Sequence, residues 1–409
     1  MSDMESTAAR PTAPVDSWPW APPAQPTGRS LALQLGVATL ARVFLNTARR
    51  FAYPFAPALS RGLGVPLTAV TSLVAANQAT GILSPFFGPL GDRWGYRRVM
   101  LIGLAMLATG MLIGGLLPVY AAVLLALFLA GLGKSVFDPA IQAFTSERVP
   151  YERRGLAIGL IEVSWAGSSL LGIPAAGLLI DRLGWRSPFL ALGSLAILIA
   201  IVLRLLIPDD RRRAEPRSGG AGNRQDWQRL LRDRAVLGAL GFSFLISAAN
   251  DNLFIIYGAW LERAFGLSVV ALGAATLVIG LAELLGEGLT ATLSDRVGLR
   301  RAITIGLTLS ALSYAALPWI AQSLALALTG LFAVFLTFEF TIVTAFSLFT
   351  EIVPDARATM MSGVLAGSAV GRVVGAFIGG PVWLAGGLWA VGLVSAFGTI
   401  LALFCLRRT

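Results

Sequence analysis

The chain has no histidine, and it has one cysteine and one lysine among its 409 residues. A single cysteine, Cys405, excludes a disulfide within the chain and every metal motif built from several cysteines. Histidine is the side chain that ordinarily titrates near neutral pH, so a proton carrier here must be a carboxylate or Lys134. The sequence also has no nucleotide-binding loop, so we do not expect an ATP-driven pump. Because the metal motifs named above are absent, we do not expect a metalloenzyme either, and we expect no bound cofactor.

Charged residues are scarce as well. They make up 13% of the chain, where a soluble domain carries roughly a quarter. Hydrophobic residues reach 56%, and the mean hydropathy is +0.74. The net charge of +10 is spread over short arginine clusters between apolar runs. That pattern is typical of loops facing anionic lipid and does not indicate a nucleic-acid surface. The composition predicts a protein that crosses a membrane many times.

Twelve apolar runs reach the length of about 20 residues that a membrane span needs. We place them at 31–59, 67–90, 97–117, 119–145, 156–180, 186–207, 234–262, 268–292, 300–319, 322–349, 359–384 and 387–406. The arginine-rich segment 208–233 separates the first six runs from the last six. The expected organisation is therefore a flexible tail (1–30), a first bundle (31–207), a linker (208–233) and a second bundle (234–409).

Arginine is distributed unevenly between the loops. With the N-terminus inside, the inner loops and the linker hold most of the loop arginines, whereas the outer loops hold Arg61, Arg182, Arg186 and Arg263. Positive charge favours the cytoplasmic side. We therefore expect a protein of the inner (plasma) membrane with both termini in the cytoplasm.

The two halves of the chain resemble each other. "GPLGDRWGYRRVML" at 88–101 aligns with "ATLSDRVGLRRAIT" at 291–304. The alignment pairs Asp92 with Asp295, Gly95 with Gly298, Arg97 with Arg300 and, further on, Glu147 with Glu351. The interval stays near 203 residues, which indicates a duplication. Parallel six-helix repeats are a known transporter plan.

The first of these loops resembles the signature of the major facilitator superfamily between helices two and three, and the resemblance extends from about residue 31 to the end. It implies an all-α membrane protein of twelve transmembrane helices in two pseudo-symmetric six-helix bundles, which work by alternating access. It also implies a cytoplasmic gate, whose residues would be Gly88, Asp92, Arg93, Gly95, Arg97, Glu147, Asp295, Arg296, Gly298, Arg300 and Glu351. Gly95 suits a tight turn with positive φ. In the family, Arg97 would bridge to Glu147 and Arg300 to Glu351.

The resemblance is to drug-efflux-like members, with two departures. The arginine that efflux members usually carry in helix four is Leu127 here. Their Gly-Pro signature in helix five is replaced by "GIP" in the stretch "GSSLLGIPAAGLL". Drug–proton antiport therefore does not transfer directly from the resemblance.

Several ionisable residues fall inside the predicted spans, where charges are costly and usually functional. Lys134 and Asp138 share a helix face one turn apart. They form either a self-sufficient internal pair that supports a kink at Pro139 or a site that opens when a proton or solute arrives. Lys134 is also close enough to satisfy the Ser135 carbonyl that Pro139 leaves free.

Glu283 and Glu287 lie one turn apart in span eight, and like charges on one face favour protonation of at least one. The alternative is separate pairing with arginines, for which Arg372 is a candidate. Asp251 lies mid-span between Asn250 and Asn252, which suggests a polar cluster. Arg49 and Arg50 point about 100° apart, so at most one of them would line the cavity, and the other would either snorkel or pair with an acid. The remaining candidates for coupling or substrate contact are Arg42 and Glu339.

The leading hypothesis is a secondary transporter and not an enzyme. It would move a small organic or amphiphilic solute by alternating access, with proton-coupled export as the leading mode. The alternatives are a proton-coupled uptake symporter, a lipid or lysolipid flippase, and a sensor that does not transport. The expected partners are a small-molecule substrate, protons and the lipid bilayer, with no nucleic acid, and the chain would act as a monomer.

Overall fold

The computed structural model describes residues 28–149, 160–209, 232–353 and 357–409, and every regular element in these ranges is a helix. Ten helices are long and apolar enough to cross a membrane, or eleven if the bent pair Ala56–Leu63 and Leu67–Leu83 forms one span. The last helix, α17 (Arg357–Leu406), has 50 residues and leaves helical φ/ψ at Gly386 and Gly387, so it supplies two spans. With this division the described residues contain the twelve spans that the hydropathy predicts.

The first half of the chain builds six spans, and the helices of spans two and five change type along their length. Span two passes through a 3-10 turn, and span five contains a π-helical segment. The elements are α1 (Gly28–Arg50), α2 (Ala56–Leu63), α3 (Leu67–Ala79), η2 (Thr80–Leu83), α4 (Ser84–Trp94), α5 (Tyr96–Leu116), α6 (Tyr120–Arg148), α8 (Ser164–Gly167), η3 (Ser168–Gly172), α9 (Ile173–Leu183) and α10 (Ser187–Leu206).

The second half repeats this plan. Its elements before α17 are α12 (Arg234–Phe254), α13 (Tyr257–Phe265), α14 (Val269–Val297), α15 (Leu299–Ile320) and α16 (Leu324–Ile352). The predicted spans overlap these helices throughout and differ by a few residues at their ends. The predicted tail at 1–30 and most of the linker at 208–233 lie outside the described residues, so those assignments stay predictions.

Three pairs of glycines with positive φ mark equivalent turns in the two halves. Gly95 (φ 84°) and Gly298 (φ 88°) are 203 residues apart, and so are Gly184 (φ 86°) and Gly387 (φ 58°). Gly64 (φ 66°) and Gly266 (φ 65°) are 202 residues apart. An L side chain rarely adopts this conformation. The turn predicted at Gly95 is confirmed, and the spacing supports the internal duplication.

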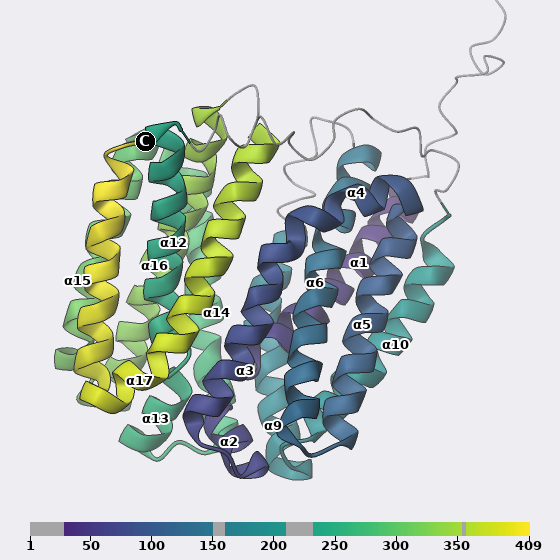
Figure 1. The fold of residues 1–409 in the computed structure, drawn as a ribbon, viewed down its shortest axis with the longest axis horizontal. Coiled ribbons are helices and arrows are strands. Elements are labelled where there is room, and N and C mark those ends of the chain that lie inside the picture. The colour runs from purple at the N-terminus through teal and green to yellow at the C-terminus, as the bar shows by residue number, and fades with distance from the viewer. Residues whose placement is uncertain (1–27, 150–159, 210–231, 354–356) are drawn as a thin grey trace, which may run out of the picture.

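The two halves lie side by side and touch mainly through elements away from the linker (Figure 1). We call the end of the molecule where α10 stops and α12 starts the linker end, and the opposite end the far end. Contacts between the halves join α17 to α3 and η2, α14 to η3 and α9, and α13 to α2. In this conformation the two halves therefore contact each other mainly through the far-end portions of the spans.

Spans one and seven are both interrupted close to this closure. Residues 51–55 separate α1 from α2, and residues 255–256 separate α12 from α13. A Cβ on Gly258 would lie 2.2 Å from the carbonyl oxygen of Pro54, so only glycine lets the two breaks touch. The breaks place Tyr53 and Phe254, both buried, at the interface between the halves.

Candidate functional site

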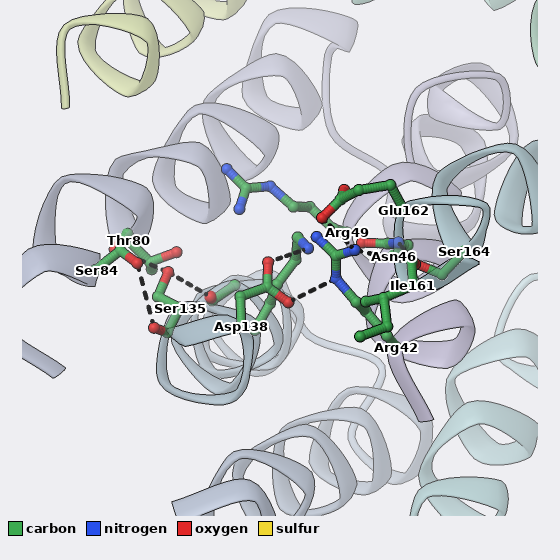
Figure 2. Close-up of polar contacts among 12 residues, drawn as sticks. Arg42, Asn46, Arg49, Thr80, Ser84, Ser135, Asp138, Ile161, Glu162 and Ser164 are labelled. Atoms are coloured by element: carbon green, nitrogen blue, oxygen red, sulfur yellow. Dashed lines mark hydrogen bonds and ion pairs between the residues drawn. The ribbon is translucent and has the colours of Figure 1, made fainter. Parts of the chain in front are cut away.

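A group of four charges occupies the interior of the first half (Figure 2). Arg42 Nε lies 3.0 Å from Asp138 Oδ1, and Arg42 Nη1 lies 2.9 Å from Glu162 Oε1. Lys134 Nζ lies 2.5 Å from Asp138 Oδ2. We call these four residues the Arg42 cluster. The i,i+4 pair predicted from the sequence is present, but it is not self-sufficient, because Arg42 of α1 binds the same carboxylate.

Pro139 frees the carbonyl of Ser135, as the sequence predicts, but the partner is different. Ser84 Oγ donates to the Ser135 oxygen over 3.3 Å, while the hydrogen bond of Lys134 goes to Asp138. The expectation that Lys134 satisfies this carbonyl is therefore wrong. Figure 2 shows Ser84 and Thr80 reaching α6 from the side opposite to Arg42. Pro139 lies inside one continuous helix, α6.

A second ion pair crosses between the halves. Arg50 Nη2 lies 2.5 Å from Glu283 Oε1, and Arg50 Nη1 donates to Glu283 Oε2 over 3.2 Å. Ser169 Oγ donates to the same Oε2 over 3.1 Å. Both charged side chains are at most 10% exposed. Arg50 is therefore the partner of Glu283 for which the sequence offered Arg372 as a candidate. Of the two alternatives left open for the second arginine of the Arg49 and Arg50 pair, Arg50 shows pairing with an acid.

A hydrogen-bonded chain of five residues also crosses between the halves. Tyr53 Oη donates to Asp251 Oδ1 over 2.6 Å, and Arg372 Nη1 lies 3.5 Å from Asp251 Oδ2. Gln78 Nε2 donates to Tyr53 Oη, and Arg49 Nε donates to Gln78 Oε1 over 2.7 Å. We call Arg49, Gln78, Tyr53, Asp251 and Arg372 the Asp251 chain. Asp251 is fully buried, so its charge depends on these partners.

The amides beside Asp251 do not join this chain. Asn250 accepts a hydrogen bond from Tyr314 Oη at 3.3 Å, and Asn252 donates to Ser395 Oγ at 3.0 Å. Successive residues on a helix point about 100° apart. The two amides therefore connect α12 to α15 and α17. The polar groups that contact Asp251 are instead Tyr53 and Arg372, which come from other segments of the chain.

Three carboxylates meet where α14 faces α16. Glu339 Cβ would lie 2.8 Å from a Cβ placed on Gly286, which is between Glu283 and Glu287 in the sequence. Among the described residues, Arg50 is the one cation in ion-pair contact with this group, through Glu283. We call Glu283, Glu287 and Glu339 the acidic trio. Glu287 and Glu339 remain partly exposed.

Trp165 connects these groups through its ring. Lys134 Nζ lies 4.8 Å from the ring centroid and the Arg50 guanidinium carbon lies 5.1 Å from it. Cations over an aromatic face are attracted by its quadrupole. Trp165, Gln78 and Ser169 are not among the residues expected from the sequence. Gln78 could have been noticed as a polar side chain within the apolar run 67–90.

The predicted gate residues lie at the linker end. The side chains of Asp92 and Asp295 are outside the described part of the structure, and Arg93, Glu147, Arg296, Arg300 and Glu351 are exposed. Arg97 Nη2 lies 2.8 Å from Asp209 Oδ2, and Nη1 donates to the Ile207 carbonyl over 3.1 Å. The ion pairs of the described residues include neither Arg97 with Glu147 nor Arg300 with Glu351, so this conformation does not contain the two expected bridges.

Comparisons of the sequence identify relatives over most of its length. The family model of the Major Facilitator Superfamily matches residues 38–256 and 239–409. An uncharacterized MFS-type transporter, YceJ of Bacillus subtilis (strain 168), is 29% identical over 71% of this chain and 75% of the relative. The multidrug resistance protein MdtG of Citrobacter koseri is 29% identical over 70% and 73%. The multi-drug resistance efflux pump PmrA homolog of Lactococcus lactis is 24% identical over 82% and 86%.

Solved structures share the fold at low sequence identity. A mutant of the nucleoside transporter NupG superimposes with a TM-score of 0.76 at 13% identity, over 92% of this chain and 99% of that one. A bacterial homolog of the human lysosomal transporter Spinster, in an inward-facing and unoccupied conformation, gives 0.72 at 17% identity over 94% and 98%. The chain is thus a multi-pass membrane transporter and not an enzyme, and it belongs to the Major Facilitator Superfamily.

Proposed function

We propose that this transporter couples the movement of a small organic or amphiphilic solute to protons by alternating access. It would act as a monomer in the inner (plasma) membrane, with both termini in the cytoplasm and without nucleic-acid partners. The observation that carries the proposal is that the two buried bridges between the halves described above end on carboxylates, Glu283 and Asp251. A proton on either carboxylate would remove the charge that holds its partner.

The acidic trio supplies the place for a proton. Glu283 pairs with Arg50, whereas the ion pairs of the described residues include neither Glu287 nor Glu339. Unpaired negative charge inside a membrane protein is costly unless protons balance it. Glu283 belongs both to this trio and to the bridge with Arg50. Protonation of the trio and release of the bridge would therefore be linked events.

Export is the leading direction. The relatives MdtG and the PmrA homolog are named for multidrug resistance and multidrug efflux, and they match most of this chain. Their names say nothing about this chain's solute, so the class remains small organic or amphiphilic compounds. In an exporter, entry of protons would drive the solute outward.

Uptake is a second candidate, which one contact favours. Asp251 holds Arg372, and the other groups facing this carboxylate are Tyr53 directly and Arg49 and Arg50 at longer range. A proton on Asp251 would release Arg372 to bind a solute. A proton and a solute that favour each other's binding travel in the same direction.

Imposed gradients distinguish the two directions. A thermal-shift screen of the purified chain against small organic and amphiphilic compounds would first supply a transported solute. Proteoliposomes with a pH dye inside then report proton movement when that solute and a proton gradient of either sign are applied. Antiport moves protons against the solute, and symport moves them with it. Solute flux that ignores both gradients would refute proton coupling.

A further inference from the structure

The charges at the centre of the molecule are not balanced evenly. In the Arg42 cluster, two cations face two carboxylates. Arg50 is matched by Glu283. In the Asp251 chain, however, Arg49 stands at one end and Arg372 at the other, and Asp251 is the only described carboxylate at ion-pair distance from either. Glu339 acts on Arg372 only from a greater distance.

Arg49 keeps unused hydrogen-bonding capacity. Its Nε and Nη2 both donate to one neutral acceptor, Gln78 Oε1. A guanidinium has five N–H donors, and no described carboxylate lies within ion-pair distance of this one. In Figure 2 the Arg49 guanidinium extends past the Arg42 cluster without a contact to Asp138. A membrane-embedded cation without a counter-ion is costly and points to a ligand.

The two guanidiniums approach the same place between the halves. A Cβ on Gly81 would lie 3.3 Å from Arg49 Nη2 and 3.2 Å from Ala369 Cβ. Ala369 precedes Arg372 by three residues, about one turn of α17. The charge of Arg372 is also close enough to act on Arg49. Glycine at position 81 leaves this approach open.

Both side chains keep part of their surface exposed. The Arg372 side chain is 23% exposed, although it pairs with an Asp251 that is fully buried. Arg49 is likewise only partly buried. The pair therefore combines the two features of a ligand site, accessible donors and a fixed position set by Gln78 and Asp251.

We propose that Arg49 and Arg372 form an anion subsite, and that the transported solute carries a carboxylate, sulfonate or phosphate group. Guanidinium groups bind these planar or tetrahedral anions through paired, charge-assisted hydrogen bonds. The anion would restore neutrality between two cations and one carboxylate. The inference rests on the proposed transport function. An anion subsite would make uptake, the second candidate above, the favoured direction in place of export, because an anion and a proton at Asp251 would favour each other's binding.

The test is binding of matched probes to the full chain in phosphatidylcholine nanodiscs. Benzoate, benzenesulfonate and phenyl phosphate are compared with neutral benzamide and cationic benzylamine. We expect the anions to bind at least roughly 10-fold more tightly than benzamide and benzylamine, because a charge-assisted hydrogen bond contributes about that much to affinity. Equal or tighter binding of benzamide or benzylamine, or no binding of any anion, would overturn the proposal.

Substitutions separate a ligand contact from a structural role. Arg49→Gln and Arg372→Gln should each reduce anion binding roughly 10-fold, while Arg61→Gln at the exposed far-end pair with Glu262 leaves it unchanged. Asp251→Asn removes the competing negative charge and should strengthen anion binding. Weaker anion binding by Asp251→Asn in a folded protein, or unchanged binding by both arginine variants, contradicts the assignment.

A lipid headgroup offers the same chemistry as a soluble anion. Adding phosphatidylglycerol to the nanodiscs distinguishes the two sources, because a lipid occupant would displace benzoate and a soluble anion site would not respond. Either response supports an anion subsite. This binding test needs no proton flux, so it can fail while proton coupling stands, and the liposome experiment can fail while anion binding stands.

Discussion

Tyr53 Oη donates a 2.6 Å hydrogen bond to Asp251 Oδ1 across the interface between the halves. Tyr257 lies 204 residues after Tyr53, is equally buried and stacks on the same Phe254 ring, yet its hydroxyl has no hydrogen-bond partner among the described residues. The duplicated tyrosines thus occupy similar apolar surroundings, but only the first one contacts a charge. This difference provides a matched pair for testing the bridge.

Tyr53→Phe should weaken far-end closure, because it removes a hydrogen bond to a carboxylate worth about 1.5–3 kcal/mol. Spin labels at Arg182 and Arg263, placed by cysteine substitution in a Cys405→Ser background, would report the distance between the halves. We expect a broader or longer distance distribution. Tyr257→Phe is the control and should leave the distribution unchanged. Identical distributions for both variants would mean that the Tyr53 bridge does not hold the closed state.

Asp251→Asn and Glu283→Gln should uncouple solute movement from the proton gradient while sparing exchange of the solute. Both carboxylates are buried and end bridges between the halves, so their protonation inside the protein is the step that proton coupling requires. Proton flux measured beside solute flux in liposomes checks this. Glu262→Gln, in the half-exposed pair with Arg61, should keep its coupling. If both central variants stay coupled, Glu339 becomes the next candidate.

Gly258→Ala should destabilise the protein, because the new Cβ would lie 2.2 Å from the Pro54 carbonyl oxygen. Overpacking of this kind costs about 1–3 kcal/mol. Thermal unfolding in detergent should show a lower midpoint. Gly36→Ala has no atom within 4 Å of its new Cβ and serves as the control. Equal midpoints for the two variants would mean that the breaks in spans one and seven can separate freely.

Asp92→Asn should shift the balance between outward-open and inward-open states without preventing membrane insertion. The prediction rests on the duplicated signature loop and on the turn geometry of Gly95 and Gly298. Inter-bundle distances from spin labels at the linker end provide the measurement. Arg98→Gln, which we expect to remove only an interfacial anchor, should change them little. Unchanged distances in Asp92→Asn would count against a latch.

Gly220→Cys in a Cys405→Ser background should resist impermeant thiol reagents added outside intact cells, because the arginine asymmetry predicts a cytoplasmic linker. Gln322→Cys, in the exposed turn between α15 and α16, is the positive control and should react. Labelling at position 220 from outside would reverse the proposed orientation.

Hydropathy alone was enough to locate the spans, because each must bury about 20 apolar residues whatever its neighbours are. It did not reveal the breaks at 51–55 and 255–256. Those breaks depend on Pro54 meeting Gly258, a contact between segments that are far apart in the chain. The glycine turns at 95 and 298 were accessible to sequence reasoning, because positive φ is a local requirement.

The sequence by itself determined which ionisable residues are buried in the membrane and that Lys134 faces Asp138, because helical periodicity fixes neighbours within one helix. Only the tertiary structure decided that Arg50 pairs with Glu283, 233 residues away, and that Asp251 accepts a hydrogen bond from Tyr53, 198 residues away. Periodicity orients a side chain around its own axis but carries no information about which helix of the other half it meets. That choice is made by the packing of the two halves, where small residues such as Gly81 and Gly258 allow close approach.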